Sequence, residues 1–194
     1  YTPARTAPSN NIAHDSHVTV EEEVEPLEQI EGGVSRLHAE VAADLLDRLR
    51  NQAPEFLEQS VLDVLVAMGY GGTEGRAARI GGSGDGGVDG VIDQDPLGLE
   101  RIYVQAKRYA TDNIVGRPEI QAFVGALHGV GAARGVFITT SAFTSGAREY
   151  AQNIATRIIL IDGQRLADLM IRYGVAVQTR QIFTVVEVDE DYFE

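Results

Sequence analysis

The chain has 194 residues, with 16 lysine and arginine residues, 29 aspartate and glutamate residues and no cysteine. This length suits one domain with an additional tail. The missing cysteines exclude disulfides, thiolate zinc sites and thiol nucleophiles. No run of about 18 apolar residues predicts a membrane span. The chain begins at Tyr1 without a signal-peptide stretch, which predicts a fragment of a longer cytoplasmic protein with no membrane partner.

A net charge of −13 argues by itself against a nucleic-acid partner. The negative charge is, however, concentrated at the two ends of the chain. Residues 1–50 contain 10 acids and 4 bases, and residues 181–194 contain 5 acids and no base. The centre, residues 51–180, has 14 acids and 12 bases, so it can still carry a local basic face. Lys107 is the only lysine in the chain.

Composition divides the chain into three parts. Residues 1–33 contain proline, serine, asparagine and a glutamate run without a sustained period, which predicts a largely disordered linker. Residues 34–180 are predicted to form the folded domain. Residues 181–194 form an acidic tail with a possible short strand at Ile182–Val188.

The predicted elements alternate between helices and strands. Leu37, Val41, Leu45 and Leu49 repeat every four residues, which predicts a helix from Ser35 to about residue 51. The other expected elements are a helix at 54–68, strands at 77–80, 88–92 and 101–108, a helix at 117–130, a strand at 135–140, a helix at 144–155, a strand at 157–161 and a helix at 164–173. This order predicts an α/β layered domain.

The second helix has one apolar face, formed by Leu57, Val61, Val64, Leu65 and Met68. Asp63 lies opposite this face, in solvent. Glu58 lies at the border of the face, where its carboxylate can point into a cleft.

A glycine-rich stretch, Gly82–Gly87, matches the pattern G-x-G-x-x-G. A dinucleotide site requires a strand before this pattern and a helix after it. Here a strand follows instead, so a flexible loop, or a hairpin that lets a polymer approach the backbone, is favoured.

Three polar residues flank the predicted hairpin of the second and third strands. Gln105 and Lys107 project from the same face of one strand, about 7 Å apart. Asp89 can come alongside them if the two strands are antiparallel. An acid, an amide oxygen and an ammonium suit a divalent cation with a bound water. The alternative is a solvated hairpin with ordinary polar residues, but the sole lysine at this position favours function.

These residues resemble the nuclease core of the PD-(D/E)xK superfamily. More narrowly they resemble its Mrr-type branch, in which Gln replaces the usual second acid. The resemblance covers residues 40–194 and extends to Phe56–Glu58, Ala67–Gly71, Gly82–Gly90, Gly116–Gln121, Gly135–Phe143 and Asp189–Phe193. It implies a restriction-endonuclease-like α/β fold: a mixed central β-sheet flanked by helices, with the core order αβββαβ.

The resemblance also implies roles for individual residues. Asp89, Gln105 and Glu58 would bind Mg²⁺, with Mn²⁺ as a substitute, although Glu58 can alternatively be a surface or capping acid. Lys107 would orient the attacking water and offset charge in the transition state.

Several residues have two interpretations. Arg79, Arg108 and Arg117 can contact DNA phosphates or be solvated surface arginines. Thr139–Ser141 can bind phosphate, or end a strand and cap the next helix. Asp85 can be a second acid of the site or shape the glycine turn.

The function implied by the resemblance is metal-dependent hydrolysis of DNA phosphodiester bonds in a type IV restriction system acting on modified, for example methylated, DNA. Double-stranded DNA would be the partner, and cutting both strands with one site per chain implies a homodimer or higher homo-oligomer. The alternatives are a non-catalytic DNA-binding or oligomerisation module, or a structure-specific nuclease of the junction-resolvase kind.

Overall fold

The computed structural model describes residues 25–72, 77–80, 87–95 and 97–194. Its elements follow the predicted order αα-βββ-α-β-α-β-α. They are α1 Pro26–Asn51, α2 Pro54–Ala67, β1 Ala77–Arg79, β2 Gly90–Asp93, β3 Arg101–Lys107, α3 Arg117–Gly129, β4 Arg134–Thr139, α4 Ser145–Asn153, β5 Arg157–Ile161, α5 Gly163–Tyr173 and a final 3₁₀ turn at Glu190–Tyr192. None of these described helices is long and apolar enough to cross a bilayer.

The five strands form one mixed sheet in the order β1-β2-β3-β4-β5. β2 pairs antiparallel with both β1 and β3, which confirms the predicted hairpin. β3, β4 and β5 run parallel to one another, with Val104 opposite Val136 and Phe137 opposite Leu160. β3 therefore has a paired strand on each side, one antiparallel and one parallel.

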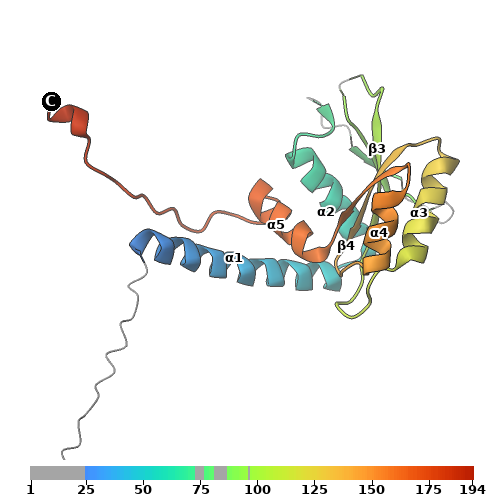
Figure 1. Ribbon diagram of the computed structural model, residues 1–194, viewed down its shortest axis with the longest axis horizontal. Helices are drawn as coiled ribbons and strands as arrows, with labels where there is room; N and C mark the ends of the chain where they lie inside the picture. The colour runs from blue at the N-terminus through green and yellow to red at the C-terminus, as the bar shows by residue number, and fades with distance from the viewer. Residues whose placement is uncertain (1–24, 73–76, 81–86, 96) are drawn as a thin grey trace, which may run out of the picture. The chain divides into compact units, whose positions relative to one another are not determined.

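Helices cover both faces of the sheet (Figure 1). Residues of β4 show the division, because Val136 and Ile138 pack in a core with α1, α2 and α5. Phe137 points to the other face and packs with α3 and α4, edge-on against Phe123 and Phe143. This alternation follows from the period of two along a strand. The predicted α/β class with a mixed sheet between helices is confirmed.

The first helix differs from the prediction at its amino end. It begins at Pro26, so residues 26–33, predicted to be part of a disordered linker, are helical. A proline in the first turn and an acid at Glu28 both favour a helix start at this point. Residues 36–194 form one compact unit, and the described residues before Arg36 belong to another.

The buried face of α1 also differs from the predicted one. Leu37 and Val41 are 54% and 41% exposed, although they continue the four-residue repeat. The buried residues of the helix are Ala42, Leu45, Leu46 and Leu49. The repeat therefore identifies a helix but overestimates how much of its length packs against the core.

The acidic tail, residues 181–194, contains no strand in the structure, so the prediction of a strand at Ile182–Val188 is wrong. All of its residues are exposed. The β-branched composition of the segment favours a strand, but a strand requires a hydrogen-bonding neighbour. None of the described strands pairs with this tail.

Asp162 closes the sheet-to-helix turn before α5 by capping the helix. Its Oδ1 accepts a hydrogen bond from the backbone N–H of Arg165 at 3.0 Å, and its Oδ2 accepts one from Arg148 at 2.8 Å. Burial raises the pKa of the carboxyl group, but the hydrogen bonds and charge of Arg148 and Arg165 outweigh burial and leave that pKa below its ordinary value.

We predict that Asp162→Ala lowers the free energy of unfolding by about 1 kcal/mol at neutral pH, because an N-cap acceptor is lost. Since the pKa of Asp162 is lowered on folding, its stabilisation is present above the unfolded pKa and is lost as the pH falls below about 4. Urea unfolding at pH 7 and pH 3 measures both effects. The exposed Asp112→Ala serves as control, and an equal loss at both pH values would contradict the charge contribution.

Candidate active site

Asp89 is held directly against the central strand. Its backbone N–H donates to the carbonyl of Val104 at 2.8 Å, and its Oδ2 accepts a hydrogen bond from the backbone N–H of Ala106 at 2.7 Å. The residue precedes β2, whose Gly90 lies opposite Val104. The antiparallel pairing therefore brings the carboxylate to the part of β3 that carries the other two predicted residues.

Gln105 and Lys107 project from one face of β3. Val104 and Ala106, which alternate with them, belong to the core shared with α2, so Gln105 and Lys107 point to the opposite face. Gln105 is 6% exposed, whereas Lys107 is half-buried. The structure thus places an acid, a buried amide and a partly exposed ammonium along two adjacent strands.

Gly87, the last residue of the glycine-rich stretch, lies against Gln105, a contact that the sequence did not predict. Its φ is +93°, and a Cβ added there would lie 3.2 Å from Nε2 of Gln105. The glycine therefore permits both a left-handed backbone and a close approach to the amide. The glycine-rich stretch was the sequence feature that pointed to this position. Residues 82–86 of that stretch, including Asp85, lie outside the described residues.

Glu58, on α2, is held by an arginine of β1. Both Nε and Nη2 of Arg79 lie 3.1 Å from Oε2 of Glu58. The side chains are 18% exposed for Glu58 and 34% for Arg79. Arg79 lies opposite Gly90, the residue after Asp89. Glu58, a predicted metal ligand, and Arg79, a predicted phosphate-binding residue, thus form an ion pair with each other.

The other two predicted DNA contacts also have partners in the protein. Arg108 donates from Nη1 to the carbonyls of Arg50 and Gln52, at 2.7 and 2.8 Å, at the carboxyl end of α1. The guanidinium of Arg117 lies 4.9 Å from the centre of the Tyr150 ring. Contact of these residues with phosphate stays a prediction, but the structure gives Arg108 a capping role.

Thr139–Ser141 use their hydroxyls to fix the loop beside the end of β3. Thr139 donates to the carbonyl of Lys107 at 2.9 Å, and Thr140 donates to the carbonyl of Tyr109 at 2.7 Å. Thr144, and not these residues, caps α4. The interpretation of this segment as the end of a strand is therefore the one supported by the contacts.

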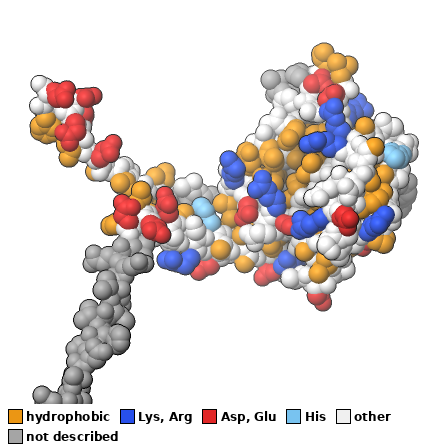
Figure 2. Space-filling model, in the orientation of Figure 1, with side chains coloured by type: hydrophobic (Ala, Val, Ile, Leu, Met, Phe, Trp, Pro, Cys, Tyr) orange, Lys and Arg blue, Asp and Glu red, His pale blue; other side chains and the backbone are white. Residues whose placement is uncertain are grey.

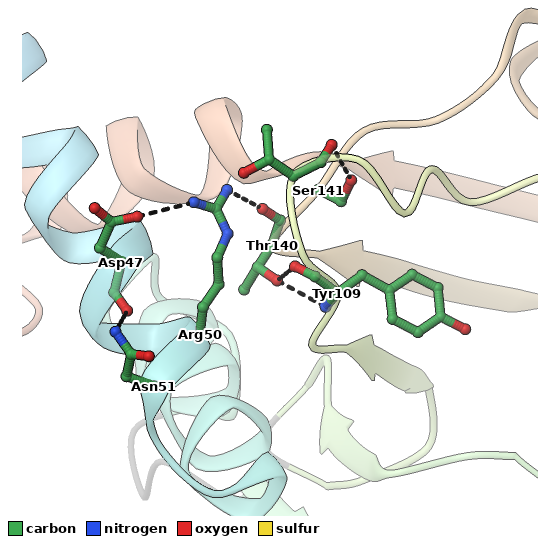
Figure 3. Close-up of polar contacts among 7 residues, drawn as sticks. Asp47, Arg50, Asn51, Tyr109, Thr140 and Ser141 are labelled. Carbon is green, nitrogen blue, oxygen red and sulfur yellow. Dashed lines mark hydrogen bonds and ion pairs between the residues drawn. The ribbon is translucent and has the colours of Figure 1, made fainter.

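Arg50 connects this loop to α1 and was not predicted to matter. Its Nη2 donates to the carbonyl of Thr140 at 2.7 Å, and its Nη1 pairs with Asp47 at 3.1 Å (Figure 3). Its buried Nε has no hydrogen-bond partner among the described residues. Together, Arg50 and Arg108 anchor the end of α1 to the ends of β3 and β4, immediately after Lys107.

The donor set suits a hard divalent cation. Among the described residues, no group of three or more His, Cys, Asp or Glu side chains is placed to hold a metal. The predicted ligands Asp89, Glu58 and Gln105 comprise two carboxylates and one amide. Oxygen ligands of this kind fit Mg²⁺, which retains several waters and takes further ligands from substrate phosphate.

This geometry agrees with a known family. The Mrr_cat family model, described as restriction endonuclease, matches residues 49–170, which is more than half of the chain. The chain belongs to this restriction endonuclease family. The matched segment contains Glu58, Asp89, Gln105 and Lys107, and members of the family generally use a divalent metal.

A relative of known function shares much of the sequence. The "type IV methyl-directed restriction enzyme EcoKMrr" of Escherichia coli strain K12 is 50% identical over 169 residues. The match covers 87% of this chain and 54% of the relative, so the chain spans about half the length of the curated protein it matches.

Two solved structures have a similar fold. The DNA modification-dependent restriction endonuclease AspBHI matches with a TM-score of 0.53 and 20% identity, over 69% of this chain and 36% of that one. A protein of unknown function, AF1548, matches with a TM-score of 0.50 and 16% identity, over 63% of this chain and 67% of that one. The first of these confirms the predicted restriction-endonuclease-like fold.

We predict that Arg108→Ala lowers the free energy of unfolding by about 1 to 3 kcal/mol, because two carbonyls at the end of α1 lose a charged donor. Urea unfolding of this variant beside the exposed Arg36→Ala provides the measurement. Equal stabilities for the two variants would show that the cap contributes nothing.

Proposed function

We propose that this chain is the catalytic domain of a type IV restriction enzyme, a metal-dependent endonuclease that hydrolyses phosphodiester bonds in modified, for example methylated, double-stranded DNA. The activity of the E. coli relative, a type IV methyl-directed restriction enzyme, supports this proposal. The observation that carries it is the pairing of β2 with β3, which fixes the Asp89 carboxylate against the strand that presents Gln105 and Lys107.

Each residue has a role that its position can support. Asp89 and Gln105 supply oxygen ligands from neighbouring strands, and Lys107 presents its ammonium two residues after Gln105. The half-buried ammonium would orient the attacking water and stabilise negative charge that develops on the phosphate. Mg²⁺, held by Asp89, Gln105 and Glu58, would polarise the scissile phosphate and lower the pKa of a bound water, and Mn²⁺ could replace it.

Glu58 acts in this proposal only after its ion pair with Arg79 is rearranged. An incoming phosphate is an alternative anion for the guanidinium. Transfer of Arg79 from Glu58 to phosphate would free the Glu58 carboxylate for a metal. Arg108 and Arg117 would also contact phosphate. Arg108 would use nitrogen atoms that do not bind the carbonyls at the end of α1, and Arg117 would use nitrogen atoms that its contact with the Tyr150 ring leaves accessible.

The proposal is tested by incubating methylated and unmethylated plasmid with the chain in the presence of Mg²⁺, Mn²⁺ or EDTA. We expect nicking or cutting of the methylated plasmid that requires the metal. DNA binding without cleavage would favour the non-catalytic module. Metal-dependent cleavage confined to four-way junctions, with no response to methylation, would favour a junction-resolvase-like enzyme.

We predict that Lys107→Ala lowers the cleavage rate at least about a hundredfold, equivalent to roughly 3 kcal/mol, because a cation near the transition state is removed. DNA affinity should change little, which a fluorescence titration in Ca²⁺ would measure. The exposed Arg36→Ala is the control for loss of one positive charge. A Lys107→Ala enzyme that cleaves at a near-normal rate would remove Lys107 from the mechanism.

We predict that Gly87→Ala reduces cleavage more than it reduces stability, because the added methyl group would displace the amide of Gln105. Gly131→Ala is the matched control, since Gly131 also has a positive φ, +69°, but an added Cβ there has open space. Each substitution costs about 1 to 2 kcal/mol of backbone strain. Parallel cleavage assays and urea titrations separate the effects, and an equal loss of cleavage in both variants would count against Gln105.

A further inference from the structure

The acidic tail exposes an unusual density of apolar side chains. Seven large apolar residues of the tail are between 62% and 84% exposed: Ile182, Phe183, Val185, Val186, Val188, Tyr192 and Phe193. Figure 2 shows hydrophobic and acidic side chains together at this end of the chain. A strand-forming apolar segment that covers no surface of its own chain is typical of an interaction element.

An apolar groove lies on the α2 face of the sheet, at the amino ends of β3, β4 and β5. It has a volume of about 430 Å³, and its apolar lining includes Leu65, Met68, Ile102, Val136, Ile159 and Ile161. We call it the β5 groove. Ile159, on the edge strand, is 45% exposed. The groove therefore leaves apolar area in contact with water where another apolar segment would fit.

The edge of the sheet next to the β5 groove is open. Among the described strands, β5 pairs only with β4, so its outer backbone groups face away from the sheet. β5 has five residues, and Ile182–Val188 is long enough to pair along all of them. A segment that adds to an edge strand forms main-chain hydrogen bonds and places alternate side chains on one face.

The charges of the two surfaces are complementary. The β5 groove is also lined by Arg134 and Arg157. Arg134 is already paired with Glu100, whereas no carboxylate of the described residues pairs with Arg157. The tail has five acids and no base after Arg180. An added strand would bring this acidic run toward an exposed guanidinium at the start of β5.

The handedness of the fold argues against the tail of the same chain as the occupant. α3 and α4 connect parallel strands on the face of Phe137, whereas α5 follows β5 on the face of Val136. A helix that follows a strand returns the chain to the amino ends of the strands, so its own tail beside β5 would run parallel to β5. The connection from β5 through α5 to such a strand would extend the sheet in the same direction as the connections through α3 and α4. Because α5 lies on the opposite face, this connection would have the opposite hand. Parallel crossovers are right-handed in about 98% of cases.

We propose that the β5 groove and the edge of β5 bind the acidic tail of a second copy of this chain, and that the two copies exchange tails reciprocally. The exchange closes with twofold symmetry, because each copy offers one tail and one groove. It gives the chain a dimer interface at the amino ends of the strands, away from Lys107 at the carboxyl end of β3.

Light scattering after size-exclusion chromatography tests this proposal with the full chain and a variant that ends at Arg180. Removal of the tail leaves every core residue in place, since residues 178–194 are all exposed. We expect a dimer for the full chain and a monomer with an unchanged thermal transition for the shortened one. A dimeric shortened chain would place the interface elsewhere and overturn the proposal. A monomeric full chain, with or without protection of its tail amides from hydrogen exchange, would also overturn it.

A peptide of residues 181–194 provides a second measurement that does not depend on the dimer. We expect this fluorescently labelled peptide to bind the shortened chain. Ile159→Asp in the β5 groove should weaken binding by at least about tenfold, roughly 1.4 kcal/mol. Arg157→Glu should weaken it more at low salt than at high salt, with Arg36→Glu as the matched control. Binding that is absent, or unaffected by Ile159→Asp, would overturn the proposal.

Discussion

The candidate site depends on the pairing of β3 along both of its edges. On one edge β2 runs antiparallel, and on the other edge β4 runs parallel, so the backbone of β3 has little freedom to shift. The Asp89 carboxylate then bonds to the amide of Ala106, between Gln105 and Lys107. This hydrogen bond and the backbone bond from Asp89 to Val104 fix the acid relative to Gln105 and Lys107. A shift of one residue in the register would turn Gln105 and Lys107 toward α2.

The carboxyl end of β3 is anchored by two arginines: Arg108, for which the sequence left open a DNA contact or a solvated surface position, and Arg50, for which it predicted no role. Arg108 caps α1, and Arg50 of α1 binds the carbonyl of Thr140 after β4. Hydroxyls of Thr139 and Thr140 bind the carbonyls of Lys107 and Tyr109. Rigid support of this kind keeps the backbone of Lys107 in place, as the proposed role of its half-buried side chain requires.

In the proposed mechanism, the ion pair of Arg79 with Glu58 links substrate binding to the acid on α2. A carboxylate of low exposure is costly in free energy unless a nearby cation compensates its charge. Arg79 supplies that compensation in the structure described here, and a metal ion would supply it in the proposed active state. In this proposal the same arginine therefore stabilises the domain without DNA and binds phosphate when DNA arrives.

The sequence by itself determined the order of elements and the hairpin, and it predicted the residues of the candidate site. The period of apolar residues and the positions of glycine and proline reflect local backbone preferences. Such preferences are strong in residues 157–161, which form a strand, and in α2. Asp89, Gln105 and Lys107 could be grouped because strand alternation and antiparallel pairing relate them by simple geometry. Glu58 could be placed at the border of an apolar face because α2 has a clear period.

Only the tertiary structure decided which partners these side chains have. The capping role of Arg108, the ion pair of Arg79 and the anchoring role of Arg50 join residues between 21 and 90 positions apart. No local pattern specifies such contacts, because they arise where separate elements meet. The segments 26–33 and Ile182–Val188 show the same limit. Residues 26–33 are helical because they continue the helix that follows, whereas Ile182–Val188 has the composition of a strand but no neighbouring strand among the described residues to pair with.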